Sequence, residues 1–337
     1  MSEPIKAVGY TRSLPADDPD SFADVWLPRP VPDAHDLLVE VRAVSVNPVD
    51  MKVRLRDDPG GEVKVLGFDA AGVVREVGDD VELFAPGDEV FYAGSVDRSG
   101  TNAALHAVDE RIVGAKPSSL GFAEAAALPL TSITAWEGLF DKLRLTSTST
   151  GTLLVVGGAG GVGSMVLQLA DVLVPDLRLI ATASRPETEE WVRSLGADEV
   201  VSHREDLRTQ LSAVAPDGVD AIFTTNAAGQ VELYADVLRP FGQVVAIDDP
   251  GPLDLWPFKK KSLTWHWESM FTRPVQRTAD RIEQHRLLTE VSRLVDAGRI
   301  RTTATTVLGP IDAEQVREAH RLIETGRTIG KIVIEDR

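Results

Sequence analysis

Residues 153–170, LLVVGGAGGVGSMVLQLA, form an uncharged stretch of eighteen residues whose glycines restrict what it can fold into. A membrane-spanning helix needs about twenty predominantly apolar residues, and the glycines between positions 157 and 163 would weaken a helix at each place they occur. Divided into three parts, the stretch predicts a buried strand at 153–156, a turn at 157–163 and an apolar helix at 164–170. We therefore expect a strand–turn–helix unit of a parallel sheet and no membrane span.

The spacing of Gly158, Gly160 and Gly163 matches G-x-G-x-x-G, a pattern typical of dinucleotide-binding turns. The first glycine permits a tight turn, the second lets a pyrophosphate approach the backbone, and the third lets the helix pack on the strand. Backbone N–H groups at the start of the helix then hold the anionic pyrophosphate. We expect contacts from Gly158, Gly160, Gly161, Val162 and Gly163. The alternative is an ordinary turn of an α/β protein that binds nothing.

The sequence after the glycine turn continues the same pattern. Further strands are predicted at 177–184, 198–202, 219–225 and 242–248, and TEEWVRSLGA and VELYADVLRPF are predicted to be crossover helices. This succession favours a doubly wound parallel sheet.

The end of the second predicted strand indicates which dinucleotide is bound. NAD-selective sites place an acidic residue about twenty residues beyond the glycines, whereas this chain has Ser184 and Arg185 there. A hydroxyl and a guanidinium favour a 2′-phosphate, and His203 and Arg204 follow the next strand. We expect NADPH. The alternative is that Arg185 is a solvated loop residue.

Composition limits the partners and the length limits the domain count. The 337 residues exceed what one core usually supports, so two domains are expected. A net charge of −17 disfavours binding to nucleic acid and to anionic membranes. The chain has no cysteine, which excludes disulfides and thiolate ligands. The first thirty residues have no secretory pattern, so a cytoplasmic location is expected.

A β-rich region with many turns precedes the glycine turn, and motifs along the chain carry a family resemblance. In order they are SVNPVD, GFDAAGVVREVG, PGDEV, AAALPLTSITAWEGL, GGAGGVGS, LGAD and GRTIGKIVI. With these motifs the chain resembles the medium-chain dehydrogenase/reductase superfamily, in its quinone oxidoreductase branch, close to the zinc-type alcohol dehydrogenase-like group. The resemblance implies a GroES-like β-rich domain at 1–125, a Rossmann domain at 126–270 and a return to the first domain at 271–337.

The chain departs from the zinc alcohol dehydrogenases of this superfamily at their metal ligands. Asn47 stands where those enzymes carry a ligating cysteine, and Phe68 replaces the histidine of their GHE motif. Catalytic zinc needs three protein ligands and an open position. A site improvised from Asp50, Asp69 and His106 is the alternative that we weigh against this. We expect no zinc.

Without zinc, hydride transfer is easiest to an acceptor that delocalises the incoming charge, such as a quinone or an α,β-unsaturated carbonyl. The resemblance places Asn47 and Thr134 beside the nicotinamide, Asn47 as a donor to the developing oxyanion and Thr134 as a partner of the carboxamide. Tyr92 is expected to donate a proton or to form a wall of the pocket. Asn47 as a turn residue and Tyr92 as simple packing are the alternatives.

Two further residues and one segment have two interpretations each. Asp69 is a proton relay or, preferably, a cap of a turn; Lys331 contacts the cofactor phosphates or extends along the surface. The segment 261–271, with Trp265 and Trp267, predicts an edge strand that pairs across a homodimer axis, or else residues of the core or the cleft. The competing functions are a metal-free alcohol or carbonyl oxidoreductase and a non-catalytic NADPH-binding protein.

Overall fold

The computed structural model describes residues 3–336, which form two compact units. The first unit comprises residues 1–133 and 271–337, and the second comprises residues 134–270. The boundary between the two units lies inside helix α3 (Pro129–Trp136).

The first unit is built mainly from two β-sheets, with order β2-β1-β4 and β15-β16-β3-β5-β6-β8, β7 also pairing with β3. Its strands are β1 (Ile5–Tyr10), β2 (Ala23–Leu27), β3 (Asp36–Val46), β4 (Lys64–Val65), β5 (Ala70–Val77), β6 (Glu89–Tyr92), β7 (Leu105–Asp109), β8 (Val113–Ala115), β15 (Ala304–Leu308) and β16 (Lys331–Glu335). Its helices are α1 (Pro48–Arg56), η1 (Glu110–Ile112), α2 (Phe122–Ala126), α8 (Thr272–Gln276), α9 (Ile282–Asp296) and α10 (Ala313–Glu324).

The last strand, β16, positions the polar site of this unit. It pairs antiparallel with β3, with Ile332 opposite Val46. This pairing brings Lys331 next to the end of β3, where the chain turns at Asn47 into helix α1. Apolar residues dominate both strands, and β16 is buried from Lys331 to Ile334, as expected for a strand inside a sheet.

The second unit contains a parallel sheet with the order β11-β10-β9-β12-β13-β14. Its strands are β9 (Gly151–Val156), β10 (Leu177–Thr182), β11 (Glu199–Val201), β12 (Val219–Thr224), β13 (Leu238–Ala246) and β14 (Thr264–Trp267). Its helices are η2 (Glu137–Lys142), α4 (Gly161–Leu173), α5 (Pro186–Arg193), α6 (Leu207–Val214), α7 (Val231–Val237) and η3 (Trp256–Lys261). The doubly wound parallel sheet predicted from the sequence is confirmed, and the strand order reverses direction between β9 and β12.

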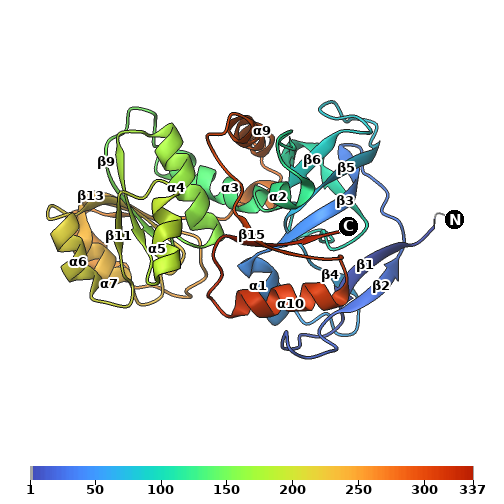
Figure 1. Ribbon diagram of the computed structural model, residues 1–337, viewed down its shortest axis with the longest axis horizontal. Coiled ribbons are helices and arrows are strands. Elements are labelled where there is room, and N and C mark those ends of the chain that lie inside the picture. Colours follow the sequence, from blue (N-terminus) through green and yellow to red (C-terminus); the bar gives the residue numbers. More distant parts are fainter. Residues whose placement is uncertain (1–2, 337) are drawn as a thin grey trace. The chain divides into compact units, whose positions relative to one another are not determined.

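Helices α4 to α7 pack along this sheet (Figure 1). On one face, Leu154, Ile180 and Ile222 pack with residues of α6 and α7 such as Leu211 and Tyr234. Alternate strand residues point to the opposite face and are also buried, which explains the continuous apolar runs in the sequence.

Several predicted boundaries are wrong by a few residues. The helix predicted over TEEWVRSLGA, which ends at residue 197, ends at Arg193 in the structure. Helix α4 begins at Gly161, so the predicted turn already contains the first residues of the helix. Helix α7 ends at Val237 and strand β13 begins at once at Leu238, before the predicted strand start at residue 242. At the start of β13 the pairing of Leu238 with Val219 of β12 overrides local propensity.

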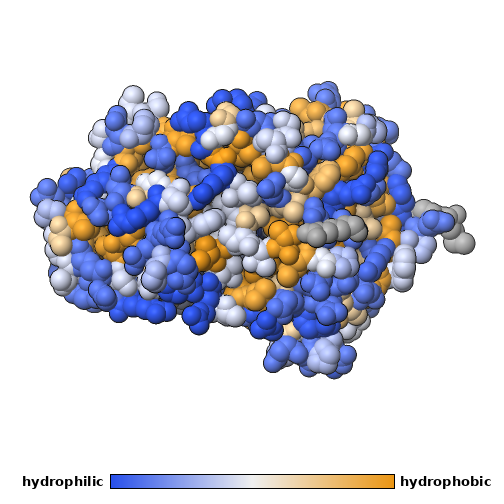
Figure 2. All heavy atoms as spheres, in the orientation of Figure 1, coloured by the Kyte–Doolittle hydropathy of each residue, from blue (hydrophilic) through white to orange (hydrophobic). Residues whose placement is uncertain are grey.

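Hydrophilic side chains cover much of the face shown in Figure 2, and the apolar ones form small separate groups. Within residues 3–336 no helix has both the length and the apolar character needed to cross a membrane.

Candidate functional site

The glycine turn follows strand β9 and leads into α4. Gly157 has a φ of +79°, and a Cβ there would lie 2.2 Å from the hydroxyl oxygen of Thr225. At Gly163 a Cβ would lie 2.3 Å from the carbonyl oxygen of Gly157, so both glycines are required by close packing.

Gly160 differs, because a Cβ there would meet only the Gly157 carbonyl oxygen, at 3.5 Å, among the described atoms within 4 Å. Gly160 precedes the helix, and the N–H groups of Gly161, Val162 and Gly163 lie in its first turn. Such groups have no acceptor within the helix. The turn therefore fits a pyrophosphate, with open space at Gly160 for the approach to the backbone.

A second polar group lies where β10 and β11 end. The Ser184 hydroxyl oxygen is 3.2 Å from Nε2 of His203. Arg185 precedes helix α5, and its Nε lies 3.1 Å from a carboxylate oxygen of Glu187. Burial and the charges of Arg204 and Arg185 lower the pKa of His203. The structure thus brings Ser184 and His203 together at the carboxyl ends of neighbouring strands, the edge at which open parallel sheets bind ligands.

The first unit holds a separate, fully buried polar network around Asn47. The Asn47 side-chain N–H donates to Asp69 Oδ2 at 2.8 Å and to the Phe68 carbonyl at 3.5 Å, and its Oδ1 accepts from Lys331. The Lys331 ammonium also donates to the Val46 carbonyl at 2.9 Å and pairs with Asp69 at 3.2 Å. An ammonium has three N–H donors, and here all three have partners.

Lys331 is only 3% exposed, so the surface interpretation of this lysine is wrong. A lysine at the start of an inner strand cannot extend along the surface, and burial lowers its pKa although Asp69 and Asp50 raise it. Its donors are already used within the first unit. Lys331 as a partner of the cofactor phosphates stays an untested prediction.

The Asp69 carboxylate joins segments that are distant in sequence, and one of its acceptors is used by an N–H in the first turn of α3. Oδ1 accepts the Leu130 N–H at 2.7 Å, and Oδ2 accepts the Ser45 hydroxyl at 2.8 Å in addition to Asn47 and Lys331. Burial raises the pKa of Asp69, and Lys331 and the hydrogen bonds from Asn47, Leu130 and Ser45 counteract this. A carboxylate with so many donors is stabilised in its ionised form.

Asp50 fixes the start of α1 beside this network. Its two carboxylate oxygens accept the N–H groups of Asn47, at 2.8 Å, and of Gly67, at 3.0 Å. Burial raises its pKa to about 7, although these N–H groups and Lys331 favour the charged form. Asn47 therefore precedes the helix as a turn residue would, while its side chain is directed to Asp69 and Lys331.

Tyr92 is fully buried and stacks on His106 with ring centroids 5.5 Å apart. His106 Nε2 lies 2.9 Å from the Ser99 carbonyl, which only accepts, so Nε2 carries the proton and Nδ1 accepts from the Tyr92 hydroxyl at 3.2 Å. Burial lowers the pKa of His106 to about 4 and raises that of Tyr92. Thr134 is buried in helix α3.

The donors that a zinc ion would need are already engaged. Asp50 and Asp69 accept backbone and side-chain donors, and both His106 nitrogens have partners. Among residues 3–336 no group of three or more His, Cys, Asp or Glu side chains is arranged to hold a metal ion. The improvised set of Asp50, Asp69 and His106 does not fit zinc, because an ammonium already neutralises Asp69.

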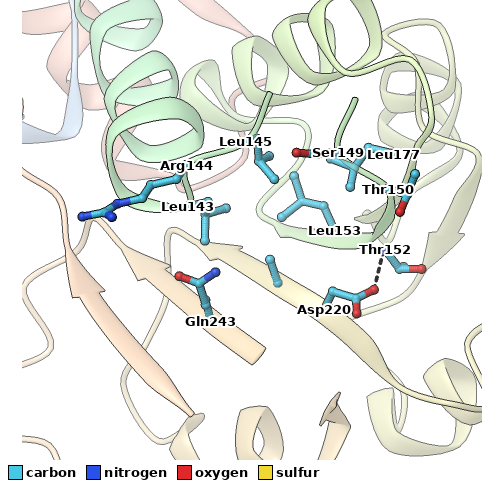
Figure 3. A pocket seen from close by; sticks show the side chains of 11 residues that line it. Leu143, Arg144, Leu145, Ser149, Thr150, Thr152, Leu153, Leu177, Asp220 and Gln243 are labelled. Atoms are coloured by element: carbon cyan, nitrogen blue, oxygen red, sulfur yellow. Dashed lines mark hydrogen bonds between the residues drawn. The ribbon is translucent and has the colours of Figure 1, made fainter. Parts of the chain in front are cut away.

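A cavity of about 230 Å³ lies at the opposite edge of the parallel sheet, at the amino ends of its strands (Figure 3). Leu143, Leu145 and Leu153 line it, together with Asp220, whose carboxylate accepts the Thr152 N–H at 2.7 Å. Ligands of doubly wound sheets bind at the carboxyl ends. This cavity is therefore separate from the glycine turn and the Ser184–His203 pair.

Sequence reasoning named Asn47, Asp69 and Lys331 separately but missed that they contact one another, and it missed the structural roles of Asp50 and Ser45. These residues lie on β3, α1, β16 and the segment before β5. The one local signal was an acidic residue three positions after Asn47, the spacing of a capping box.

Comparisons with known proteins agree with this architecture. A model described as the alcohol dehydrogenase GroES-like domain matches residues 33–137, and one described as zinc-binding dehydrogenase matches residues 195–334. A zinc-type alcohol dehydrogenase-like protein of Staphylococcus epidermidis is 39% identical over 98% of this chain and 99% of its own length. A solved structure from Rhizobium etli CFN 42, provisionally described as a zinc-dependent alcohol dehydrogenase, is 52% identical, with a TM-score of 0.95 over 99% of both chains.

Two plant relatives are more distant. The 2-methylene-furan-3-one reductase of Solanum lycopersicum is 33% identical over 90% of this chain and 73% of its own length. The NADPH-dependent alkenal/one oxidoreductase of Arabidopsis thaliana is 32% identical over 88% of this chain and 71% of its own length. The Escherichia coli quinone oxidoreductase in complex with NADPH is 22% identical, covers 98% of this chain and 99% of its own, and shares the fold with a TM-score of 0.82.

Proposed function

Because the chain belongs to the medium-chain dehydrogenase/reductase superfamily, in the zinc-type alcohol dehydrogenase-like group, we propose that it is a zinc-independent, NADPH-dependent reductase of conjugated carbonyl compounds. The observation that carries the proposal is the buried ion pair of Lys331 and Asp69. Phe68 stands where zinc enzymes of this superfamily carry a histidine ligand. The carboxylate of the next residue, Asp69, pairs with the ammonium of Lys331. No step of the reaction proposed here passes through a metal.

The acceptor proposed first is an α,β-unsaturated ketone or aldehyde, and a quinone is the alternative. Both plant relatives bear names that describe reduction of a carbonyl conjugated with an alkene. Such acceptors spread the charge of an incoming hydride onto oxygen, so positioning and one hydrogen-bond donor replace a Lewis acid. The quinone oxidoreductase of Escherichia coli supports the fold only.

NADPH is the proposed cofactor because the second unit offers both of its anion-binding elements. The N–H groups of Gly161, Val162 and Gly163 suit the pyrophosphate. Ser184, Arg185 and His203 suit the 2′-phosphate, for which a guanidinium fork is well matched. When bound, NADPH supplies the hydride.

Asn47 is the residue proposed to stabilise the developing oxyanion. Its amide oxygen accepts a hydrogen bond from Lys331, and one amide N–H donates to Asp69. The other N–H makes only the 3.5 Å contact with the Phe68 carbonyl. This weakly engaged N–H is the donor that an oxyanion would take over. Thr134 is proposed to hold the nicotinamide carboxamide. Tyr92 is proposed as packing, because its buried hydroxyl already donates to His106.

The test is NADPH oxidation by chelator-treated protein with an enone, an ortho-quinone and a simple saturated aldehyde, repeated with NADH. We expect turnover of the enone that survives chelation, faster with NADPH than with NADH, and no turnover of the aldehyde. An Asn47→Ala variant is expected to lower kcat by about 10²–10³-fold, the usual effect of removing an oxyanion donor.

Other results would contradict this proposal in different ways. Activity that disappears with the chelator and returns with zinc would overturn the metal-free mechanism. Aldehyde reduction that survives chelation would favour the metal-free carbonyl oxidoreductase. Binding of NADPH without turnover of any acceptor would favour the non-catalytic alternative.

We also propose that the chain forms a homodimer through strand β14. This strand ends the sheet order, Trp265 packs toward the core, and Trp267 is half exposed. An edge strand with an exposed aromatic side chain suits pairing with a second copy. Sedimentation equilibrium of the full chain is expected to give the dimer mass and the Trp267→Lys variant the monomer mass; a monomeric wild-type chain would overturn the proposal.

A further inference from the structure

The polar group at the carboxyl ends of β10 and β11 includes His203, and histidine is the one type of side chain that titrates close to neutral pH without a large shift. Its Nε2 shares a hydrogen bond of 3.2 Å with the Ser184 hydroxyl. Because a hydroxyl both donates and accepts, this bond can run in either direction: in the neutral ring the direction follows the tautomer, whereas in the protonated ring Nε2 carries a hydrogen and must donate.

We propose that binding of NADPH is coupled to the uptake of one proton by His203, so that selectivity for NADPH over NADH rises as the pH falls. This inference rests on the proposed function and concerns the same pocket. It makes the preference for NADPH over NADH depend on pH, which the presence of Ser184 and Arg185 alone does not imply.

The charged groups around His203 favour its neutral form when no phosphate is bound. Arg185 lies at the start of α5 and Arg204 directly follows His203 in the chain, and both guanidinium charges oppose a proton on the ring. Glu187 pairs with Arg185, and Asp206 is directed to the first N–H groups of α6. Burial and the two arginines lower the pKa of His203 below its usual value near 6.5.

A bound 2′-phosphate would reverse this balance. It brings a charge of about −1.5 to −2 to the ends of β10 and β11, and an adjacent negative charge favours the charged form of histidine. A proton taken from solvent leaves a hydrogen on both ring nitrogens, so Nε2 is then the donor to the Ser184 oxygen. The serine hydrogen is then released to donate to a phosphate oxygen, so one proton adds both a charge and a hydrogen bond.

The sign of the pH dependence follows from this direction of shift. In this proposal the pKa of His203 is lower in the free protein than in the NADPH complex. The protonated ring therefore raises the affinity for NADPH, and this increase is fully present below the pKa of the free protein. The increase is lost as the pH rises through the pKa of the complex. One linked proton changes the dissociation constant by up to about tenfold per pH unit inside this window. NADH, which has no 2′-phosphate, gives no such change.

The experiment is calorimetric titration of the full chain with NADP⁺ and with NAD⁺ between pH 6.5 and 8.5. At pH 7 it is repeated in two buffers of different ionisation enthalpy, which gives the number of protons taken up. We expect an uptake of about half to one proton for NADP⁺ and none for NAD⁺. We also expect the affinity for NADP⁺ to be about five- to tenfold weaker at pH 8.5 than at pH 6.5. The His203→Gln variant keeps a partner for Ser184 without a titrating ring, and is expected to bind NADP⁺ with a weaker pH dependence.

The variant also separates His203 from the phosphate itself, whose second pKa lies near 6. Equal proton uptake and equal pH dependence in wild type and His203→Gln would overturn the inference. A preference for NADP⁺ that is constant with pH would overturn it too, while leaving the proposed cofactor intact. A preference for NAD⁺ at every pH would overturn both the inference and the NADPH assignment.

Discussion

The two polar sites of this chain differ in how completely their hydrogen-bonding groups are used. In the first unit, all three donors of Lys331 have acceptors and the Asp69 carboxylate accepts four donors, all of them buried. In the second unit, Ser184 and His203 share one long hydrogen bond at the surface, and Arg185 pairs with the exposed Glu187.

This contrast separates a site suited to binding a ligand from a site suited to positioning a side chain. A ligand gains little from a buried group whose existing partners it must displace, because an unpaired buried polar group costs about 1–3 kcal/mol. The Lys331–Asp69 network therefore holds Asn47 in one orientation. In the proposed function, Ser184, Arg185 and His203 exchange weak partners for a phosphate at little cost.

The largest expected effect comes from removing the central charge of the network. Lys331→Met leaves the Asp69 carboxylate buried without its counter-ion, and we expect the free energy of unfolding to fall by about 3–5 kcal/mol. Scanning calorimetry of the full chain measures this as a lower unfolding temperature.

The matched control is the double variant Asp69→Asn/Lys331→Met, which contains no buried charge pair. It is expected to recover part of the lost stability, because neutral groups need no counter-ion. If Lys331→Met alone unfolds at the wild-type temperature, the contrast between a saturated network and an open pocket is wrong.

The next effect is on the open pocket. Arg185→Ala removes a guanidinium that is only partly buried, so stability is expected to change by less than about 0.5 kcal/mol. Binding of NADP⁺ is expected to weaken by about ten- to a hundredfold, since a charge-assisted hydrogen bond contributes about 1.5–3 kcal/mol. Titration with NAD⁺ is the control, and an equal loss for both nucleotides would show that Arg185 supports the loop instead of reading the phosphate.

The parallel sheet, the glycine turn and the grouping of Ser184 with His203 were predictable, because each follows from residues that are close together in the sequence or that end neighbouring strands. The strand at 153–156 and the glycines after it form one continuous segment, so pattern and spacing indicated both the parallel sheet and the turn. Ser184 and His203 follow neighbouring parallel strands, whose carboxyl ends meet at one edge, and the sequence placed both in one pocket.

The buried network was not predictable by the same reasoning. Asn47 and Lys331 are 284 positions apart, and only the pairing of β16 with β3 brings them together. A lysine in a short apolar strand carries no local sign of its partners, which is why the surface interpretation of Lys331 was wrong. The start of helix α4 was predicted too late because Gly163, which was assigned to the turn, lies in the first turn of the helix, where close approach to Gly157 and not helix propensity requires a glycine.

The smallest expected effect distinguishes an exchangeable partner from a structural one. In the proposed complex Glu187 would compete with the phosphate for Arg185. Glu187→Gln is therefore expected to tighten NADP⁺ binding about two- to fivefold, since exposed ion pairs are worth at most about 1 kcal/mol. Glu189→Gln removes another exposed carboxylate from the same helical turn and is the matched control for the change in charge. We expect Glu189→Gln to have a smaller effect and neither variant to change NAD⁺ binding. Equal tightening by both variants would mean that general electrostatics, not release of Arg185, sets the affinity, because two carboxylates in one turn exert similar long-range fields.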